Sequence, residues 1–229
     1  MSRDKKLEEN KKSDTLDKFL NFILTKNYAK YLTFIVILGA ILRYLVVKNI
    51  SFLGDEMVHG PHAINIWGSG LISTLVESPT WFYLTDIAYK IFGVTIFSSR
   101  FLSFFYGTLT ILLVYLLAKK IFNKKVALLS AAFISVSAYH IRYSLMEMDI
   151  SLAFFLLFAA YTFIKYFKEN KVQYLYLTGL LLGTGVLIKT ITAFFVPVFI
   201  IFYFILGKKD FSKKNIARYI IFGLIMFMF

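Results

Sequence analysis

The chain has 229 residues, of which 59% are hydrophobic and 19% are aromatic. This composition excludes an ordinary water-soluble domain and indicates a polytopic membrane protein. The formal net charge of +13 would suit a nucleic-acid partner, but the Lys and Arg residues lie in short clusters between apolar runs. We therefore expect membrane lipids, and no nucleic acid, as partners. The chain has no cysteine, which excludes disulfides and thiolate metal sites.

The predicted elements begin with a charged tail at residues 1–28, which we expect to lie in the cytoplasm. The apolar runs that follow predict seven transmembrane helices, some of which need tilt or their flanks to reach the roughly 20 residues of a perpendicular span. The predicted fold class is therefore all-α, a polytopic helical bundle over residues 29–229. The approximate limits of the spans are 29–47, 97–118, 126–140, 150–166, 173–188, 191–206 and 216–229.

The distribution of charge predicts the orientation of these spans. With the N-terminus in the cytoplasm and the sides alternating, all but six of the 26 basic residues fall on the cytoplasmic side, as the positive-inside rule expects. Six acids face outward, while the inner loops hold only Glu169 and Asp210. We therefore predict a multi-pass protein of the cell membrane with its polar site on the outer face. The six outward basic residues are Arg43, Lys48, Lys90, Arg100, Arg142 and Lys189.

One long outer loop, residues 48–96, separates the first two spans. Its short amphipathic stretches, with Trp67 and Trp81, predict helices lying in the membrane interface. The sequence stops at Phe229 within an apolar run, and we interpret the transmembrane domain as truncated at its C-terminus.

The start of this loop carries the densest group of polar residues, Gly-Asp-Glu-Met-Val-His-Gly at 54–60. Acids beside a span are rare, and they commonly bind a substrate, an ion or a catalytic partner. Neighbouring residues on a helix point about 100° apart, so Asp55 and Glu56 do not easily serve one small site. Asp55 suits a general base, with Glu56 orienting the substrate or facing solvent. A loop acid or a helix cap is the alternative reading of Asp55.

His59 and His62 extend this motif to Glu-x-x-His-x-x-His. This spacing can line one helical face and bind a divalent metal, so Glu56 and His59, with Asp149, are the candidate metal ligands. Gly60 and Pro61 are expected to interrupt the helix, which favours interfacial hydrogen bonding instead. No cofactor is certain from the sequence.

The other outward charges are candidates for binding substrate. Arg142 and Asp149 are seven residues apart, which would place them on one face of a continuous helix, and a guanidinium there can grip a phosphate. Glu147 and Asp149 can hold sugar hydroxyls or a metal. Lys189 and Arg100 end or begin spans on the outer side and are candidate phosphate ligands. For all of these, a snorkelling side chain or a local ion pair is the alternative.

Several stretches together resemble the GT-C membrane glycosyltransferases, in particular the protein O-mannosyltransferase and aminoarabinose-transferase branch. Residues 54–60 resemble the family's Asp-Glu motif, and 91–103 and 115–122 resemble the two ends of its second span. Residues 142–149, followed by 183–189, resemble later motifs. The resemblance covers about residues 30–206, and members of the family continue through further spans.

The resemblance implies an enzyme that moves a sugar from a polyprenyl-phosphate carrier to an acceptor hydroxyl on a protein, lipid or glycan, with inversion. Asp55 would be the general base, and Arg142 and Lys189 would stabilise the leaving phosphate. Glu56, Glu147 and Asp149 would position the sugar, or a metal. Two alternatives stay open, a transporter or flippase and a non-catalytic accessory subunit, although a transporter predicts charges nearer the midplane of the bilayer.

Overall fold

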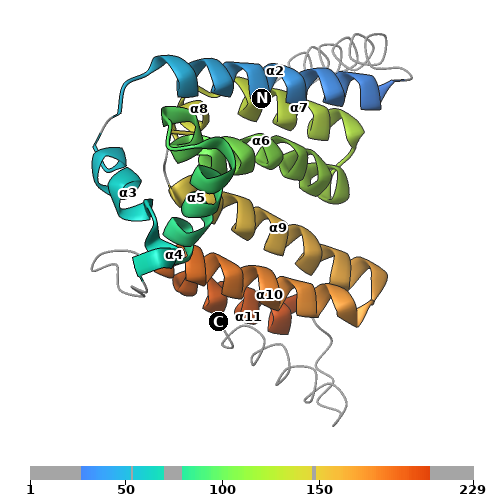
Figure 1. Cartoon of the computed structure of the whole chain (residues 1–229). Coiled ribbons are helices and arrows are strands. Elements are labelled where there is room, and N and C mark those ends of the chain that lie inside the picture. The colour runs from blue at the N-terminus through green and yellow to red at the C-terminus, as the bar shows by residue number, and fades with distance from the viewer. Residues whose placement is uncertain (1–26, 53, 70–78, 146–147, 207–229) are drawn as a thin grey trace, which may run out of the picture.

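The computed structural model describes residues 27–52, 54–69, 79–145 and 148–206, and within these ranges every regular element is a helix (Figure 1). The long helices are α2 (Tyr28–Asn49), α6 (Ile96–Ile121), α7 (Lys124–Val136), α9 (Met148–Glu169) and α10 (Val172–Ile188). The shorter elements are α3 (Glu56–Ala63), α4 (Ile66–Ser69), α5 (Pro79–Phe92), α8 (Ala138–Arg142), the 3₁₀ helix η1 (Thr190–Phe195) and α11 (Val196–Leu206).

The long helices lie side by side and run alternately in opposite directions (Figure 1). Helix α6 is central, because it packs against α2 and α7 on one side and against α9 on the other, and α10 packs against α9. The end of α2, the start of α6, α8 and the start of α9 consequently meet at one end of the bundle, where α3, α4 and α5 also lie. This end carries the candidate site.

Local sequence signals fix the turns between these helices. Thr95 and Ser98 form a reciprocal capping box at the start of α6, which satisfies backbone N–H groups that have no partner within the helix. Asn123 caps α7 by accepting from the backbone N–H groups of Lys125 and Val126, two residues after α6 ends. A short connection of this kind requires α6 and α7 to be antiparallel neighbours.

The apolar interior consists of two clusters on either side of α6. The larger joins α5, α6, α9 and α10 and includes the fully buried Trp81, Leu182 and Ile188. The smaller joins α2, α6 and α7 around Ile111 and Ala127. Large apolar side chains such as Phe34, Phe133 and Phe194 remain exposed, as expected for helices that face lipid.

Three helices, α2, α6 and α9, are long and apolar enough to span a membrane, and they match the predicted spans at 29–47, 97–118 and 150–166 closely. Helix α10 and the segment formed by η1 and α11 occupy the predicted fifth and sixth spans, but they are shorter apolar elements. The seventh predicted span, 216–229, lies outside the described residues. Helices α3, α4 and α5 occur within the predicted outer loop, and their contact with a membrane stays a prediction.

The predicted span at 126–140 is wrong at its C-terminal end. Helix α7 ends at Val136, and Ser137 starts the separate helix α8, accepting a hydrogen bond from the backbone N–H of His140. Serine hydroxyls favour helix starts over helix interiors. The expected single helix carrying Arg142 and Asp149 is also wrong, because Arg142 ends α8 and α9 begins at Met148.

Gly39 allows α2 to approach α6 and α7 closely. A Cβ atom at this position would lie 2.3 Å from Cδ1 of Ile111 and 3.1 Å from Cβ of Ser135. We expect Gly39→Val to lower the free energy of unfolding by about 1–3 kcal/mol, because the extra volume cannot be accommodated without moving neighbours. Thermal unfolding in detergent checks this, with Ala29→Val on the exposed face of α2 as the matched control. Equal stability of the two variants would contradict the prediction.

Candidate active site

Glu56 and Arg100 form a buried ion pair at the end of the bundle. Glu56 is the first residue of α3 and is 2% exposed, and Arg100, near the start of α6, is fully buried. The guanidinium approaches both carboxylate oxygens, with Nε 2.6 Å from Oε1 and Nη2 2.7 Å from Oε2. This two-point geometry is the strongest form of a carboxylate–guanidinium contact.

The remaining N–H groups of Arg100 hold the end of α2. They donate to the carbonyl oxygens of Val47, Ile50 and Ser51 at 2.7–3.0 Å. All five guanidinium N–H groups are therefore engaged within the protein. Arg100 joins the end of α2, the start of α3 and α6, and this geometry favours a positioning role over the predicted phosphate contact.

Asp55 precedes Glu56 of this ion pair in the sequence, and its side chain is exposed on the surface of the protein. It occupies the N-cap position of α3, yet among the described residues its carboxylate makes no capping hydrogen bond, and it is exposed. The structure shows the expected divergence of Asp55 and Glu56, because one side chain is exposed and the other is buried. Gly54, with φ of +53°, provides the left-handed backbone turn immediately before them.

Helix α3 is continuous through Gly60 and Pro61, so the interruption expected there is wrong. The phenol of Tyr89 on α5 donates to the carbonyl oxygen of Gly60 at 3.2 Å and contacts Oγ of Ser99 at 2.9 Å. Burial raises the pKa of this phenol, so it acts as a neutral hydrogen-bonding group at neutral pH. These contacts hold α3 against α5 and α6.

Asp86 fastens the turn between α3 and α4 to α5, a role that we did not predict. Its carboxylate accepts from the backbone N–H groups of Asn65 and Trp67 and lies 3.2 Å from Nζ of Lys90. Asn65 is in the left-handed region, with φ of 57°. Together with the Tyr89–Gly60 contact, the Asp86 contacts hold α3 and the start of α4 against α5.

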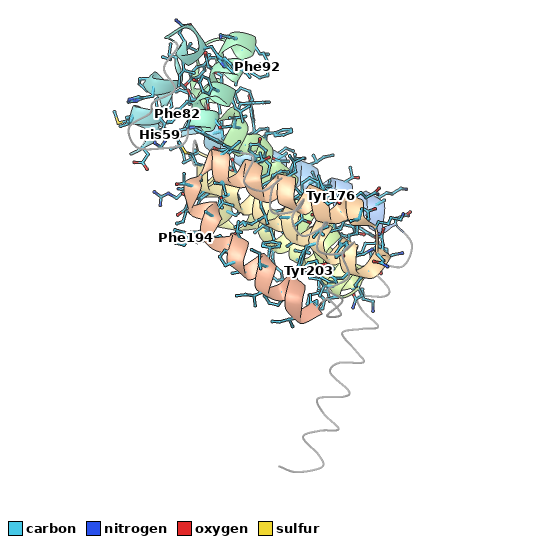
Figure 2. All side chains as sticks on the ribbon, turned by 90° about the horizontal axis from the view of Figure 1, so that it is seen from below. His59, Phe82, Phe92, Tyr176, Phe194 and Tyr203 are labelled. Carbon is cyan, nitrogen blue, oxygen red and sulfur yellow. The ribbon has the colours of Figure 1, made fainter. Side chains whose placement is uncertain are left out.

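The described residues do not assemble the predicted metal ligands. His59 packs edge-on against Phe82, with ring centroids 5.6 Å apart, and Figure 2 shows the two residues together at the α3–α5 end. Glu56 is engaged with Arg100. Within the described ranges no group of three or more His, Asp or Glu side chains is placed to hold a metal ion.

The second group of predicted residues meets where α9 begins and α10 ends. Nζ of Lys189, the residue after α10, lies 2.7 Å from Oδ1 of Asp149 in the first turn of α9. Both side chains remain partly exposed, 22% for Lys189 and 42% for Asp149. Arg142 is exposed at the end of α8. Glu147 lies outside the described residues.

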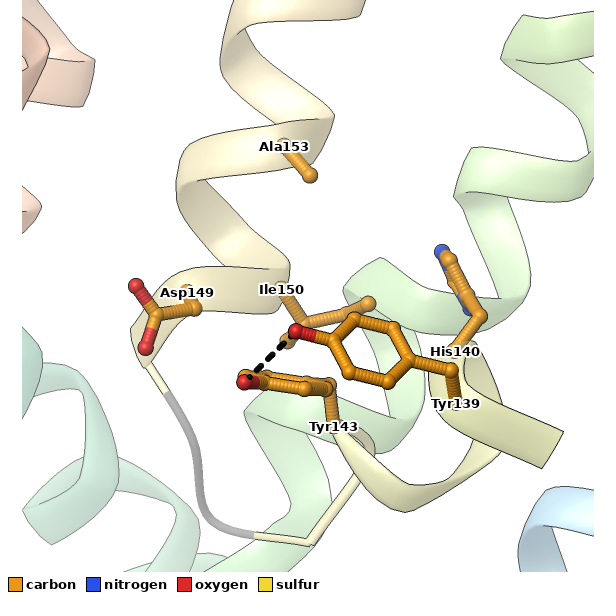
Figure 3. A pocket seen from close by; sticks show the side chains of 6 residues that line it. All are labelled: Tyr139, His140, Tyr143, Asp149, Ile150 and Ala153. Atoms are coloured by element: carbon orange, nitrogen blue, oxygen red, sulfur yellow. Dashed lines mark hydrogen bonds between the residues drawn. The ribbon is translucent and has the colours of Figure 1, made fainter.

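A cavity of about 240 Å³ opens beside Asp149. Figure 3 shows Asp149 and His140 on opposite sides of it, with Tyr139 and Tyr143 between them. Sequence reasoning singled out Asp149 but missed the tyrosines and His140. The signal that could have found them is Tyr-His-Ile-Arg-Tyr at 139–143, polar rings at the end of an apolar helix.

Comparison with known proteins decides the family. The profile of the family described as dolichyl-phosphate-mannose-protein mannosyltransferase matches residues 76–229. The chain belongs to this family. The mannosyltransferase match includes Arg100, Arg142, Asp149 and Lys189, and it begins after Asp55 and Glu56. The resemblance that the motifs predict is thereby confirmed at the level of the family, which is one of GT-C membrane glycosyltransferases.

Two curated relatives extend this comparison. An Aquifex aeolicus (strain VF5) chain described as "Uncharacterized protein" is 28% identical over 188 residues, which are 77% of this chain and 37% of the relative. The Bacillus subtilis (strain 168) protein described as "Putative mannosyltransferase YkcB" is 26% identical over 146 residues, 63% of this chain and 20% of the relative. The chain thus matches well under half the length of either. No solved structure matches it significantly.

Proposed function

We propose that this mannosyltransferase-family protein transfers a sugar from a polyprenyl-phosphate donor to an acceptor hydroxyl on the outer face of the cell membrane, with inversion at the anomeric carbon. The observation that carries the proposal is the exposed carboxylate of Asp55, adjacent to the buried Glu56–Arg100 pair. A base that must meet two substrates has to be accessible, and it also has to be held in place.

In the proposed reaction, Asp55 takes the proton of the acceptor hydroxyl. The acceptor oxygen forms a bond to the anomeric carbon as the bond from that carbon to the phosphate oxygen breaks, and the polyprenyl phosphate leaves with the bonding electrons. Cations stabilise the negative charge that develops on the leaving oxygen. Lys189 and the exposed Arg142 supply them, and Asp149 binds sugar hydroxyls beside Lys189.

Glu56 and Arg100 act as positioning residues in this proposal. Both oxygens of Glu56 and all five N–H groups of Arg100 are engaged by protein groups, so neither reaches the reacting atoms. Their contribution is to fix the backbone on both sides of Asp55. The divalent metal that the sequence allowed has no assigned role here.

This function is tested by measuring which class of sugar donor the protein uses. Membranes containing the protein should transfer labelled sugar from polyprenyl-phosphate mannose to an acceptor and should release polyprenyl phosphate, whereas labelled GDP-mannose without lipid carrier should give no transfer. The anomeric configuration of the product, read by NMR, should be opposite to that of the donor. Direct use of the nucleotide sugar would contradict the proposal. Movement of the lipid-linked sugar across the membrane without transfer would instead support a flippase.

A further inference from the structure

The cavity between α8 and α9 is small and has chemically mixed walls. At about 240 Å³ it is below the roughly 300–1,000 Å³ of sites for drug-sized ligands, so it suits one ring rather than a long chain. Its polar lining residues are Tyr139, His140, Tyr143 and Asp149, and Ile150 and Ala153 supply an apolar side (Figure 3).

The contacts of Arg43 determine the protonation of His140. Nη2 of Arg43 lies 2.8 Å from Nδ1 of His140, and a guanidinium can only donate. Nδ1 must therefore accept, so the ring is neutral and its proton is on Nε2. Arg43 also donates to the carbonyl oxygens of Ile134 and Ser135 at the end of α7, which holds α8 and His140 in place.

The resulting Nε2–H group is buried, and none of the described residues accepts a hydrogen bond from it. A buried donor left unpaired is unfavourable, and native proteins rarely retain one without a partner. His140 lines the cavity, but its Nε2 atom has almost no accessible surface, so His140 forms part of the cavity wall and donates no hydrogen bond to a ligand there.

Across the cavity, Asp149 offers carboxylate oxygens that accept hydrogen bonds, and Lys189 balances its charge at 2.7 Å. Sugar hydroxyl groups can donate to carboxylate oxygens, so they match the side of the cavity formed by Asp149. A phosphate would meet the Asp149 carboxylate at close range with no donor from that group. The cavity itself therefore favours a neutral polyhydroxyl ring over a phosphate.

The tyrosine pair completes this match. The rings of Tyr139 and Tyr143 lie 4.7 Å apart, and the Tyr139 hydroxyl donates to that of Tyr143 at 3.0 Å. Tyr139 is 72% exposed, so its ring is open to a ligand. The negative face of an aromatic ring packs favourably against the polarised C–H groups of a pyranose.

We propose that this cavity is the subsite for the sugar ring of the donor, with the ring packed on Tyr139 and its hydroxyls bound by Asp149. This inference rests on the proposed function and names the part of the protein that distinguishes a sugar-bearing carrier from the bare polyprenyl phosphate. Tyr139 is an additional ligand-binding residue on this account.

Direct binding separates this subsite from catalysis. In the full protein carrying Asp55→Asn to prevent turnover, we would measure Kd for polyprenyl-phosphate mannose and for polyprenyl phosphate in detergent. The unaltered cavity should favour the mannose-bearing lipid. Tyr139→Ala should weaken mannose-lipid binding about tenfold and leave binding of polyprenyl phosphate unchanged, whereas Tyr139→Phe should retain most of the preference.

The matched control is Phe133→Ala on α7, which truncates an aromatic residue that is also exposed, at 74%, and does not line the cavity. It should change neither Kd. The subsite would be overturned if the preference for the mannose-bearing lipid survived Tyr139→Ala. Equal binding of both lipids by the unaltered cavity would also overturn it. In either case the transfer assay would still test the proposed function independently. Binding of neither lipid would overturn both proposals.

Discussion

Asp55→Asn should lower the rate of sugar transfer by about 10²–10⁴-fold, the contribution of a positioned general base. Asparagine has nearly the same size and remains a favourable N-cap residue, but its amide cannot take the acceptor proton. Because Asp55 is exposed, the substitution removes no buried contact, and the folded fraction should be unchanged. Transfer from polyprenyl-phosphate mannose, normalised to folded protein by size-exclusion chromatography, is the measurement.

Glu169→Gln is the matched control for this prediction, because it makes the same carboxylate-to-amide change at the opposite end of the bundle, where Glu169 pairs with Lys120. It should leave transfer unchanged. If Asp55→Asn retained the activity of this control, Asp55 would not be the base. Loss of transfer in both variants would indicate a general effect of lost negative charge.

The second large effect is expected at the buried ion pair. Arg100→Ala should lower the free energy of unfolding by about 3–5 kcal/mol, because the Glu56 carboxylate would remain buried without its partner. Three backbone carbonyl oxygens, those of Val47, Ile50 and Ser51, would also lose their donor. Thermal or denaturant unfolding in detergent, followed by intrinsic fluorescence, checks this.

The Lys120–Glu169 pair is the control for burial. Its charged atoms are also 2.7 Å apart, but both side chains are more than a quarter exposed, so Lys120→Ala should cost far less than Arg100→Ala. Equal losses at the two pairs would contradict the role assigned to burial.

The positioning role of Arg100 is tested by a kinetic measurement. In the fraction of protein that remains folded, Arg100→Lys should lower kcat for transfer more than it changes KM. An unchanged kcat would show that the position of Asp55 does not depend on the contacts of Arg100.

The helical class, the three helices long enough to span a membrane and the family could be predicted from the sequence, because each depends on local composition or on short motifs. Long apolar runs form helices wherever backbone groups must be satisfied internally, and the match of α2, α6 and α9 to their predicted limits follows from this. Capping residues likewise act within one turn, as Ser137 does where it ends the predicted third span early.

Local sequence could not predict which of the charged residues are exposed and which form buried contacts. Asp55 and Glu56 are adjacent and chemically alike, but Arg100, 44 residues later, buries one and leaves the other exposed. Arg43 is connected to His140 across 97 residues, and that contact fixes the proton on the ring that lines the cavity. Hydrogen bonds and burial depend on which helices pack together, and contacts at such separations have no signature in local sequence.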